Sequence, residues 1–249
     1  MEWQDDGIVL SARRFGEHDA IIEAMTPNHG RARGFVKAGM SRRSKANLQP
    51  GNLLKLNWRS RLENNLGRFQ LELVHSPLGS LISDGARMSA LAAVTAVVSS
   101  TMPERENHPM VYDALSGYVA LLEAEDGALE HWAAALAQIE LGILTELGYG
   151  LDLTACAATG NTEGLVFVSP KSGRAVSAHA GGPYKEKLFA LPGFLLGAAK
   201  ITPTSEDAFA ALRLTGYFLE RNVWVVAGVG QPGARDRLIS SLAKRQVNN

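Results

Sequence analysis

The first side chains that could do chemistry are three cations and one ring in the segment Arg31-Ala32-Arg33-Gly34-Phe35-Val36-Lys37. Side chains of a β-strand alternate between its two faces, so every second residue of this segment should share one face. That face carries Arg31, Arg33, Phe35 and Lys37. Cations neutralise phosphates, and an aromatic ring stacks on bases for about 1–3 kcal/mol per base. The pattern predicts a single-strand binding surface. The alternative is that Phe35 is a core residue and the arginines are a solvated strand edge.

Three further cations follow in the segment 39–47, which we expect to be a flexible loop: Arg42, Arg43 and Lys45. No acid lies in this segment, although a solvated loop usually mixes both signs. From Arg31 to Arg68 the chain has ten basic residues and one acidic residue, Glu63. Such an excess of positive charge indicates a polyanion or an acidic partner as the ligand. Mobile basic loops are suited to contacts with phosphate backbones. The candidate DNA-binding residues are therefore Arg31, Arg33, Phe35, Lys37, Arg42, Arg43 and Lys45.

Five short apolar segments must position these residues. They are residues 8–10, 20–25, 31–37, 54–59 and 69–73, separated by Gly, Pro and Asn turns. In the fourth, Leu54, Leu56 and Trp58 alternate with polar side chains, which is typical of a half-buried strand. Five strands in about 70 residues predict a small barrel of the oligonucleotide-binding type, with a β-sandwich fragment as the alternative.

Helical spacing begins near Ser80, so the fold class is α+β. Helices are predicted over residues 81–98, 109–123, 129–147, 184–191, 205–226 and 235–245. Gly148 stands at a C-cap position, and Thr204 and Asp207 have capping-box spacing. Residues 150–183 lack periodicity and form an irregular insert. We therefore expect a DNA-binding barrel domain over 1–79 and a helical domain over 80–249, with the insert at about 150–183.

The net charge of zero, from 25 basic and 25 acidic residues in 249, conceals three blocks. Residues 1–80 have 12 basic and 8 acidic side chains, residues 81–150 have 2 and 10, and residues 151–249 have 11 and 7. The chain has no apolar run of the roughly 18–20 residues that a membrane span needs, and its N-terminus is acidic. With a single cysteine, these features predict a reducing cytoplasm.

Cys156 and His179 could suggest a thiol nucleophile or metal ligands. A structural zinc site needs four Cys or His ligands, and residues 150–185 contain one of each. A lone cysteine is more often a buried small hydrophobe. A Cys156-dependent enzyme remains one alternative, and an adaptor that binds an acidic protein partner is another.

Four segments resemble the bacterial recombination-repair family RecO. The first is Gly30–Gly39 followed by Leu48-Gln49-Pro50-Gly51, which is similar to the family's N-terminal barrel. The others are residues 147–160, 168–177 and 191–195, which are similar to its central insert and the segment beyond it. The similarity runs in order over nearly the whole chain.

The resemblance implies an oligonucleotide-binding barrel joined to a helical domain with a zinc-ribbon-like insert. It also implies a non-enzymatic recombination mediator in DNA repair, without a cofactor, in the bacterial cytoplasm at the nucleoid. Such a protein binds single- and double-stranded DNA and the C-terminal tail of single-strand binding protein. It anneals complementary strands coated with that protein and, with RecR, promotes RecA loading at gaps. This chain departs from the family's four-cysteine pattern, because only Cys156 remains and Thr159 replaces a partner.

We predict that the purified protein contains no stoichiometric zinc and that chelators leave its melting temperature unchanged. The reason is that Cys156 and His179 alone cannot complete a four-coordinate site. Elemental analysis of the purified chain tests this, and one zinc per chain would contradict it.

Overall fold

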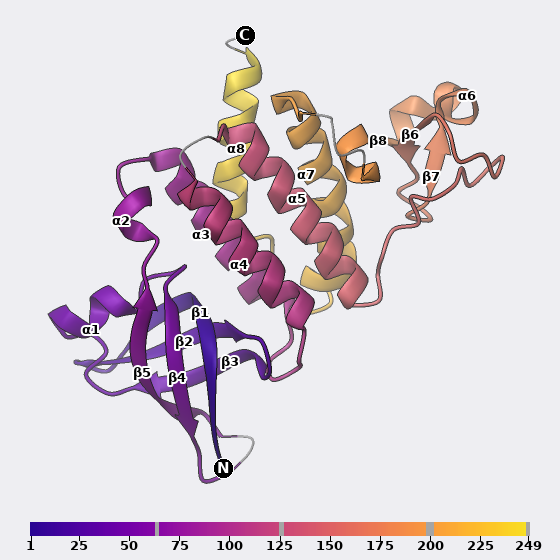
Figure 1. Ribbon diagram of the computed structural model, residues 1–249. Coiled ribbons are helices and arrows are strands. Elements are labelled where there is room, and N and C mark those ends of the chain that lie inside the picture. The colour runs from indigo at the N-terminus through magenta and orange to yellow at the C-terminus, as the bar shows by residue number, and fades with distance from the viewer. Residues whose placement is uncertain (63–64, 125–126, 198–201, 248–249) are drawn as a thin grey trace. The chain divides into compact units, whose positions relative to one another are not determined.

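The computed structural model describes residues 1–62, 65–124, 127–197 and 202–247 (Figure 1). The chain forms two compact units, Met1–Glu125 and Asp126–Asn249. Helices α3 and α4, whose bounds are given below, belong to the first unit. The predicted domain boundary at residues 79 and 80 stays a prediction. Among the described helices, none has the length and hydropathy to cross a membrane.

The first unit contains the predicted barrel. Its strands are β1 (Glu2–Phe15), β2 (Asp19–Thr26), β3 (Gly30–Val36), β4 (Leu53–Arg59) and β5 (Gly67–His75). They close in the order β1-β2-β3-β5-β4, with every neighbouring pair antiparallel except β3 and β5. This confirms a barrel of the oligonucleotide-binding type and the α+β class.

Strand β1 is 14 residues long, whereas the sequence predicted only residues 8–10. Its first half pairs with β4 and its second half with β2, and the register shifts between Val9 and Ser11. Such a bulge bends a strand and increases its twist. The bent strand β1 can therefore pair with β4 along its first half and with β2 along its second half, which allows the five strands to close into a barrel.

The barrel closes through a short parallel contact between β3 and β5. Only two residue pairs are in register there, Gly34 with Gly67 and Phe35 with Arg68. A Cβ atom on Gly34 would lie 2.3 Å from the Phe69 ring, and one on Gly67 would lie 2.0 Å from the Trp58 ring. Both positions need glycine because the two rings occupy the space of a side chain.

Helices α2 (Leu78–Leu81), α3 (Gly85–Thr101) and α4 (Pro109–Glu123) complete the first unit. Helix α3 contacts β1 and helix α4 contacts β2 (Figure 1). Residues on the outer face of these strands, such as Ile8 and Met25, are consequently buried. Burial on both faces explains why β1 and β2 contain continuous apolar runs instead of alternation.

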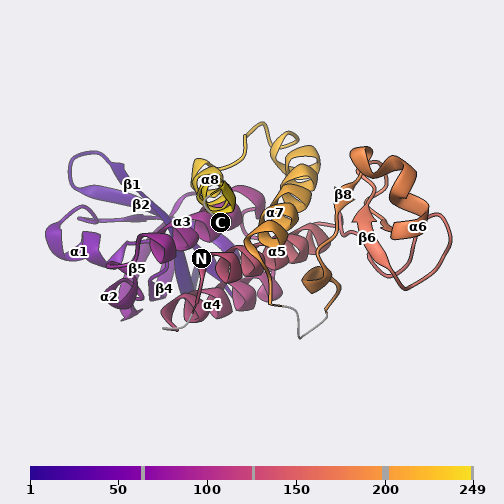
Figure 2. The same ribbon diagram turned by 90° about the horizontal axis from the view of Figure 1, so that it is seen from above.

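The second unit is built on three helices that lie side by side (Figure 2). They are α5 (Leu129–Glu146), α7 (Ser205–Leu219), which continues as the π-helical η3 (Glu220–Trp224), and α8 (Gly233–Val247). Gly148 has φ +82°, as a C-cap requires. Thr204 and Asp207 form the predicted capping box.

A buried ion pair connects these helices. The Arg235 guanidinium of α8 donates to the Glu140 carboxylate of α5 at 2.7 and 2.8 Å. The Arg235 and Glu140 side chains are 1% and 0% exposed. The Thr215 hydroxyl of α7 also donates to Glu140, and Arg235 lies 5.7 Å from the Trp224 ring centroid. Buried charges need this degree of pairing.

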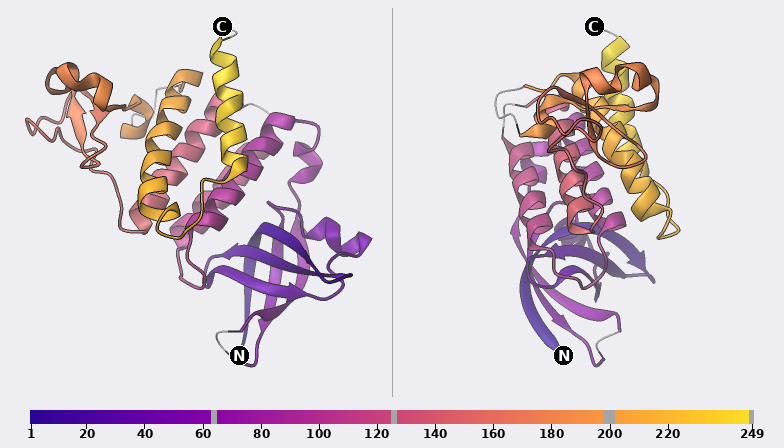
Figure 3. Two further views of the ribbon diagram at one scale, coloured as in Figure 1. Left: turned by 180° about the vertical axis from the view of Figure 1, so that it is seen from behind. Right: turned by 90° about the vertical axis from the view of Figure 1, so that its right-hand side faces the viewer.

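The insert contains a three-stranded sheet in the order β7-β6-β8. Its elements are β6 (Leu165–Val168), β7 (Ala175–Ser177), α6 (Ala178–Gly181), η1 (Gly182–Lys187), β8 (Phe189–Ala190) and η2 (Gly193–Leu196). Figures 2 and 3 show this sheet and α8 on opposite sides of α7. The predicted helix over residues 184–191 is wrong beyond Lys187, because β8 pairs with the edge of β6 instead.

We predict that Gly67→Ala lowers the free energy of unfolding by about 1–3 kcal/mol, because the new methyl group overlaps the Trp58 ring. Gly117→Ala in α4 is the matched control. Nothing lies within 4 Å of the Cβ position at Gly117, so this change should be neutral or stabilise the protein by up to about 1 kcal/mol. Urea denaturation of both variants measures the difference, and equal midpoints would contradict the packing at the barrel closure.

We predict that Arg235→Met lowers the free energy of unfolding by about 3–5 kcal/mol, because it leaves the Glu140 carboxylate buried without its partner. The control is Arg237→Met on the same helix, where the side chain is exposed and the effect should stay within about 0.5 kcal/mol. Thermal and urea unfolding provide the measurement. A loss below about 1 kcal/mol for Arg235→Met would contradict a stabilising role of this pair.

Candidate nucleic-acid interface

Strand β3 presents its predicted residues to the outside of the barrel. Burial alternates along it, so that Ala32, Gly34 and Val36 are buried and the residues between them are half-exposed. These half-exposed residues are Arg31, Arg33 and Phe35. Lys37 follows directly after the strand and is exposed. Arg31, Arg33 and Phe35 thus share the outer face of β3, and Lys37 follows at the end of that face.

The two arginines of this face are engaged in ion pairs. Glu23 of β2 lies 3.5 Å from Arg31 and 3.3 Å from Arg33, and Glu104 lies 3.5 Å from Arg33. The Arg31 Nε group also donates to the Met102 carbonyl at 2.7 Å. The Arg31 and Arg33 side chains are 16% and 31% exposed. The sequence did not indicate this, because the segment after α3 is distant from β3 along the chain.

The segment expected to be a flexible loop contains a helix, α1 (Arg42–Asn47). The Ser41 hydroxyl accepts from the Ser44 backbone N–H and caps its N-terminus. The buried Asn52 side chain donates to the Ala46 and Asn47 carbonyls at 3.0 Å each. Leu48, 1% exposed, belongs to the barrel core. The cations of α1 are therefore held on a fixed element.

The exposed cations next to β3 have no acidic partner. Within the described ranges, no ion pair forms at Lys37, Arg42, Arg43 or Lys45. The turn before α1 is tied to the β1–β2 turn, since the Ala38 N–H donates to Asp19 at 2.7 Å. Positive charge here is available for a ligand.

A second ring lies beside Phe35, although the sequence pattern did not indicate it. Phe15, the last residue of β1, is half exposed, and its ring meets Phe35 edge-on at 5.9 Å. The sequence pattern predicts a strand only over residues 8–10, so Phe15 falls outside the predicted strands. We name as the basic edge the two rings and four cations that adjoin β3 and α1: Phe15, Phe35, Lys37, Arg42, Arg43 and Lys45.

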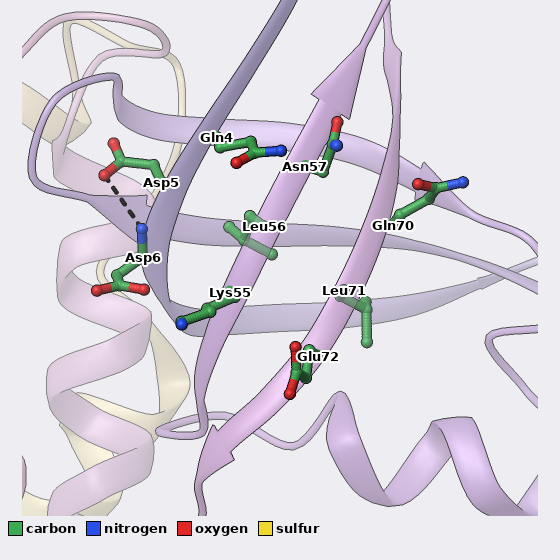
Figure 4. Close-up of a pocket in the computed structure, with 9 residues that line it drawn as sticks. All are labelled: Gln4, Asp5, Asp6, Lys55, Leu56, Asn57, Gln70, Leu71 and Glu72. Atoms are coloured by element: carbon green, nitrogen blue, oxygen red, sulfur yellow. Dashed lines mark hydrogen bonds between the residues drawn. The ribbon is translucent and has the colours of Figure 1, made fainter.

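A groove of about 590 Å³ lies elsewhere on the barrel, over β1, β4 and β5 (Figure 4). Lys55 is the cation that lines it, together with the acidic residues Asp6 and Glu72, while the Asp5 carboxylate is turned toward His29. Figure 4 shows the Asp6 backbone N–H donating to the Asp5 side chain, at 3.1 Å. This groove carries more negative than positive charge, so a polyanion would favour the basic edge.

Cys156 is part of the insert's core. Its side chain is 1% exposed, and its sulfur accepts the Ser177 backbone N–H at 3.2 Å. Hydrogen bonds with the Ser177 and Thr159 side chains lower the pKa of Cys156 to about 6, although burial opposes this shift. A substrate could not reach this sulfur, which disfavours a Cys156-dependent enzyme. The described residues contain no cluster of three or more His, Cys, Asp and Glu side chains that could hold a metal ion.

Comparison with known proteins identifies the class to which such a barrel belongs. The family model described as "Recombination protein O N terminal" matches residues 1–77, and "Recombination protein O C terminal" matches residues 82–224. The chain is 42% identical over 245 residues to "DNA repair protein RecO" of Rhodospirillum rubrum, covering 98% of this chain and 97% of that protein. It is 45% identical over 244 residues to the protein of that name from Methylobacterium nodulans, covering 96% and 97%.

These matches, which together cover most of the chain, place it among the DNA repair proteins. Within that class, the chain belongs to the RecO family of DNA repair proteins. The resemblance found in the sequence is thereby confirmed.

We predict that Glu23→Gln destabilises the protein by about 1–3 kcal/mol, because Arg31 and Arg33 lose the charge that compensates them. Glu23 also accepts from the Ser99 hydroxyl of α3 at 2.6 Å. The control is Glu17→Gln, since Glu17 is 91% exposed beside His18. Thermal unfolding measures both, and equal melting temperatures would contradict a structural role of Glu23. Reversing Arg31 and Arg33 to Glu would therefore disturb folding as well as any binding.

Proposed function

We propose that this protein is a DNA-binding recombination mediator that binds single- and double-stranded DNA through the basic edge. The observation that supports this best is the set of exposed cations without acidic partners on and before α1, which the buried Asn52 anchors. Phosphate groups would lie against Lys37, Arg42, Arg43 and Lys45. The half-exposed Phe15 and Phe35 rings would support bases of a single strand. Arg31 and Arg33 border this surface and add charge that Glu23 and Glu104 partly compensate.

Membership in the family supports a proposal for the later steps. We propose that the protein anneals complementary strands coated with single-strand binding protein, whose C-terminal tail it contacts. With RecR, it would promote RecA loading at gaps. Annealing needs a second surface for DNA or for the displaced protein, and the second unit has exposed cations at Lys171, Lys185, Lys187 and Arg213. The proposed role is binding without enzymatic turnover and without a cofactor.

We predict that Arg42→Glu with Arg43→Glu weakens binding of a labelled single-stranded oligonucleotide at least about tenfold, because two phosphate contacts become repulsive. Both side chains are exposed and neither forms an ion pair in the described ranges, so the melting temperature should not change. The control has the same charge change on α8, Arg237→Glu with Lys244→Glu, two exposed positions. Fluorescence anisotropy measures the affinities.

A salt titration of the unaltered protein completes this test. The four phosphate contacts proposed for a single strand predict a slope of log affinity against log salt of about −2.8. A slope near zero, or equal loss in the α1 and α8 variants, would contradict the basic edge as the binding surface. If bare DNA does not bind while an acidic protein does, the chain is an adaptor for an acidic partner instead.

A further inference from the structure

A pocket of about 440 Å³ opens at the end of the barrel where β3 begins and β4 ends. The residues that line it include Trp3, His29, Arg33, Trp58 and Arg105. All of them belong to the first unit. The pocket is separate from the basic edge, which lies at the opposite end of β3. Its volume falls in the range of small-molecule sites.

Three flat side chains form a ladder in this pocket. The Trp3 and His29 rings are 4.2 Å apart with an interplanar angle of 9°, and the Trp3 and Trp58 rings are 5.6 Å apart with an angle of 14°. The Asp5 carboxylate fixes the outermost ring through a 2.9 Å contact with His29 Nδ1. The His29 side chain remains 35% exposed. A nearly parallel ladder with an accessible end is suited to extension by another planar group.

Two guanidinium groups border the ladder. Arg105 lies 5.7 Å from the Trp58 ring centroid, and Arg33 lines the same pocket. Arg105 has φ +66°, a conformation that side chains other than glycine rarely adopt. Its backbone N–H donates to the Arg31 carbonyl at 3.0 Å, which holds this disfavoured geometry against β3. Backbone outliers held in this way concentrate at ligand sites.

We infer that this pocket binds one unstacked nucleobase on the Trp3–His29 ladder, with its phosphate toward Arg33 and Arg105. Planar stacking and cations together match a nucleotide, whereas an acidic peptide would use the cations and leave the ladder unused. This inference rests on the proposed binding of single-stranded DNA. The same chemistry would accept a nucleotide within a strand or a free nucleoside monophosphate.

The position of Arg33 connects the pocket with the basic edge. It lines the pocket and also lies on the outer face of β3, four residues before Lys37. Four residues of strand span about 13 Å. A strand whose base occupies the pocket could therefore run along β3 and reach the cations beside α1.

The test uses the full chain, with Trp3→Leu to remove stacking and Trp3→Phe to preserve it. Binding of labelled oligo-dT is compared with binding of an abasic oligonucleotide of equal length, which offers phosphates without bases. We expect Trp3→Leu to weaken oligo-dT binding about tenfold and Trp3→Phe to weaken it much less. Neither change should alter binding of the abasic strand. His29→Gln provides a second variant at the exposed end of the ladder, should Trp3→Leu fail to fold.

Each outcome decides a separate point. If Trp3→Leu and His29→Gln both bind oligo-dT as tightly as the unaltered protein, the pocket assignment is wrong. This holds even if the Arg42→Glu, Arg43→Glu double variant loses binding as proposed. Loss on the abasic strand as well would assign the ladder a purely structural role and also overturn it. Titration with thymidine monophosphate distinguishes the two ligands. Tight binding of the free nucleotide supports a site for free nucleotides. If only unlabelled oligonucleotide displaces the labelled oligo-dT, the site binds a nucleotide within a strand.

Discussion

The packing of two rings against two glycine backbones is the contact on which the first unit depends. Gly34 and Gly67 bring β3 and β5 together, with Phe69 and Trp58 filling the space that a side chain would need. Without this contact β3 would be a free edge of the sheet, held only by its pairing with β2. The barrel core and the aromatic ladder share Trp58, so the closure of the sheet also positions the ring at the base of the pocket.

Glu23 has a comparable role on the outside of the barrel. It faces Arg31 and Arg33 of β3 and accepts from Ser99 of α3. One half-buried carboxylate therefore brings a strand and a helix together, and it compensates charge that would otherwise repel within the face. Lys37 and the cations of α1, by contrast, form no ion pair with any residue that the structure describes. The arrangement concentrates available positive charge at one end of β3.

Much of the fold could be predicted because the patterns are local. Leu54, Leu56 and Trp58 alternate as a strand should, and α4 has the predicted bounds. The capping box of Thr204 and Asp207 also lies within one turn. The failures involve contacts between distant segments. Glu104 contacts Arg33 and β8 pairs with β6, and neither contact has a periodic signal in the sequence. Trp3 and His29 are 26 positions apart and stack only because the barrel closes.

The two ends of β3 differ in chemistry. Nearly parallel stacked rings lie near Gly30, whereas exposed cations and an edge-on pair of rings lie near Val36. A nucleic-acid strand also has two different ends, because its sugars are joined 5′ to 3′. A strand lying along β3 could not be reversed without exchanging what its bases and phosphates meet. The barrel would then hold a single strand in one preferred polarity, and a complementary strand would approach it in the opposite sense.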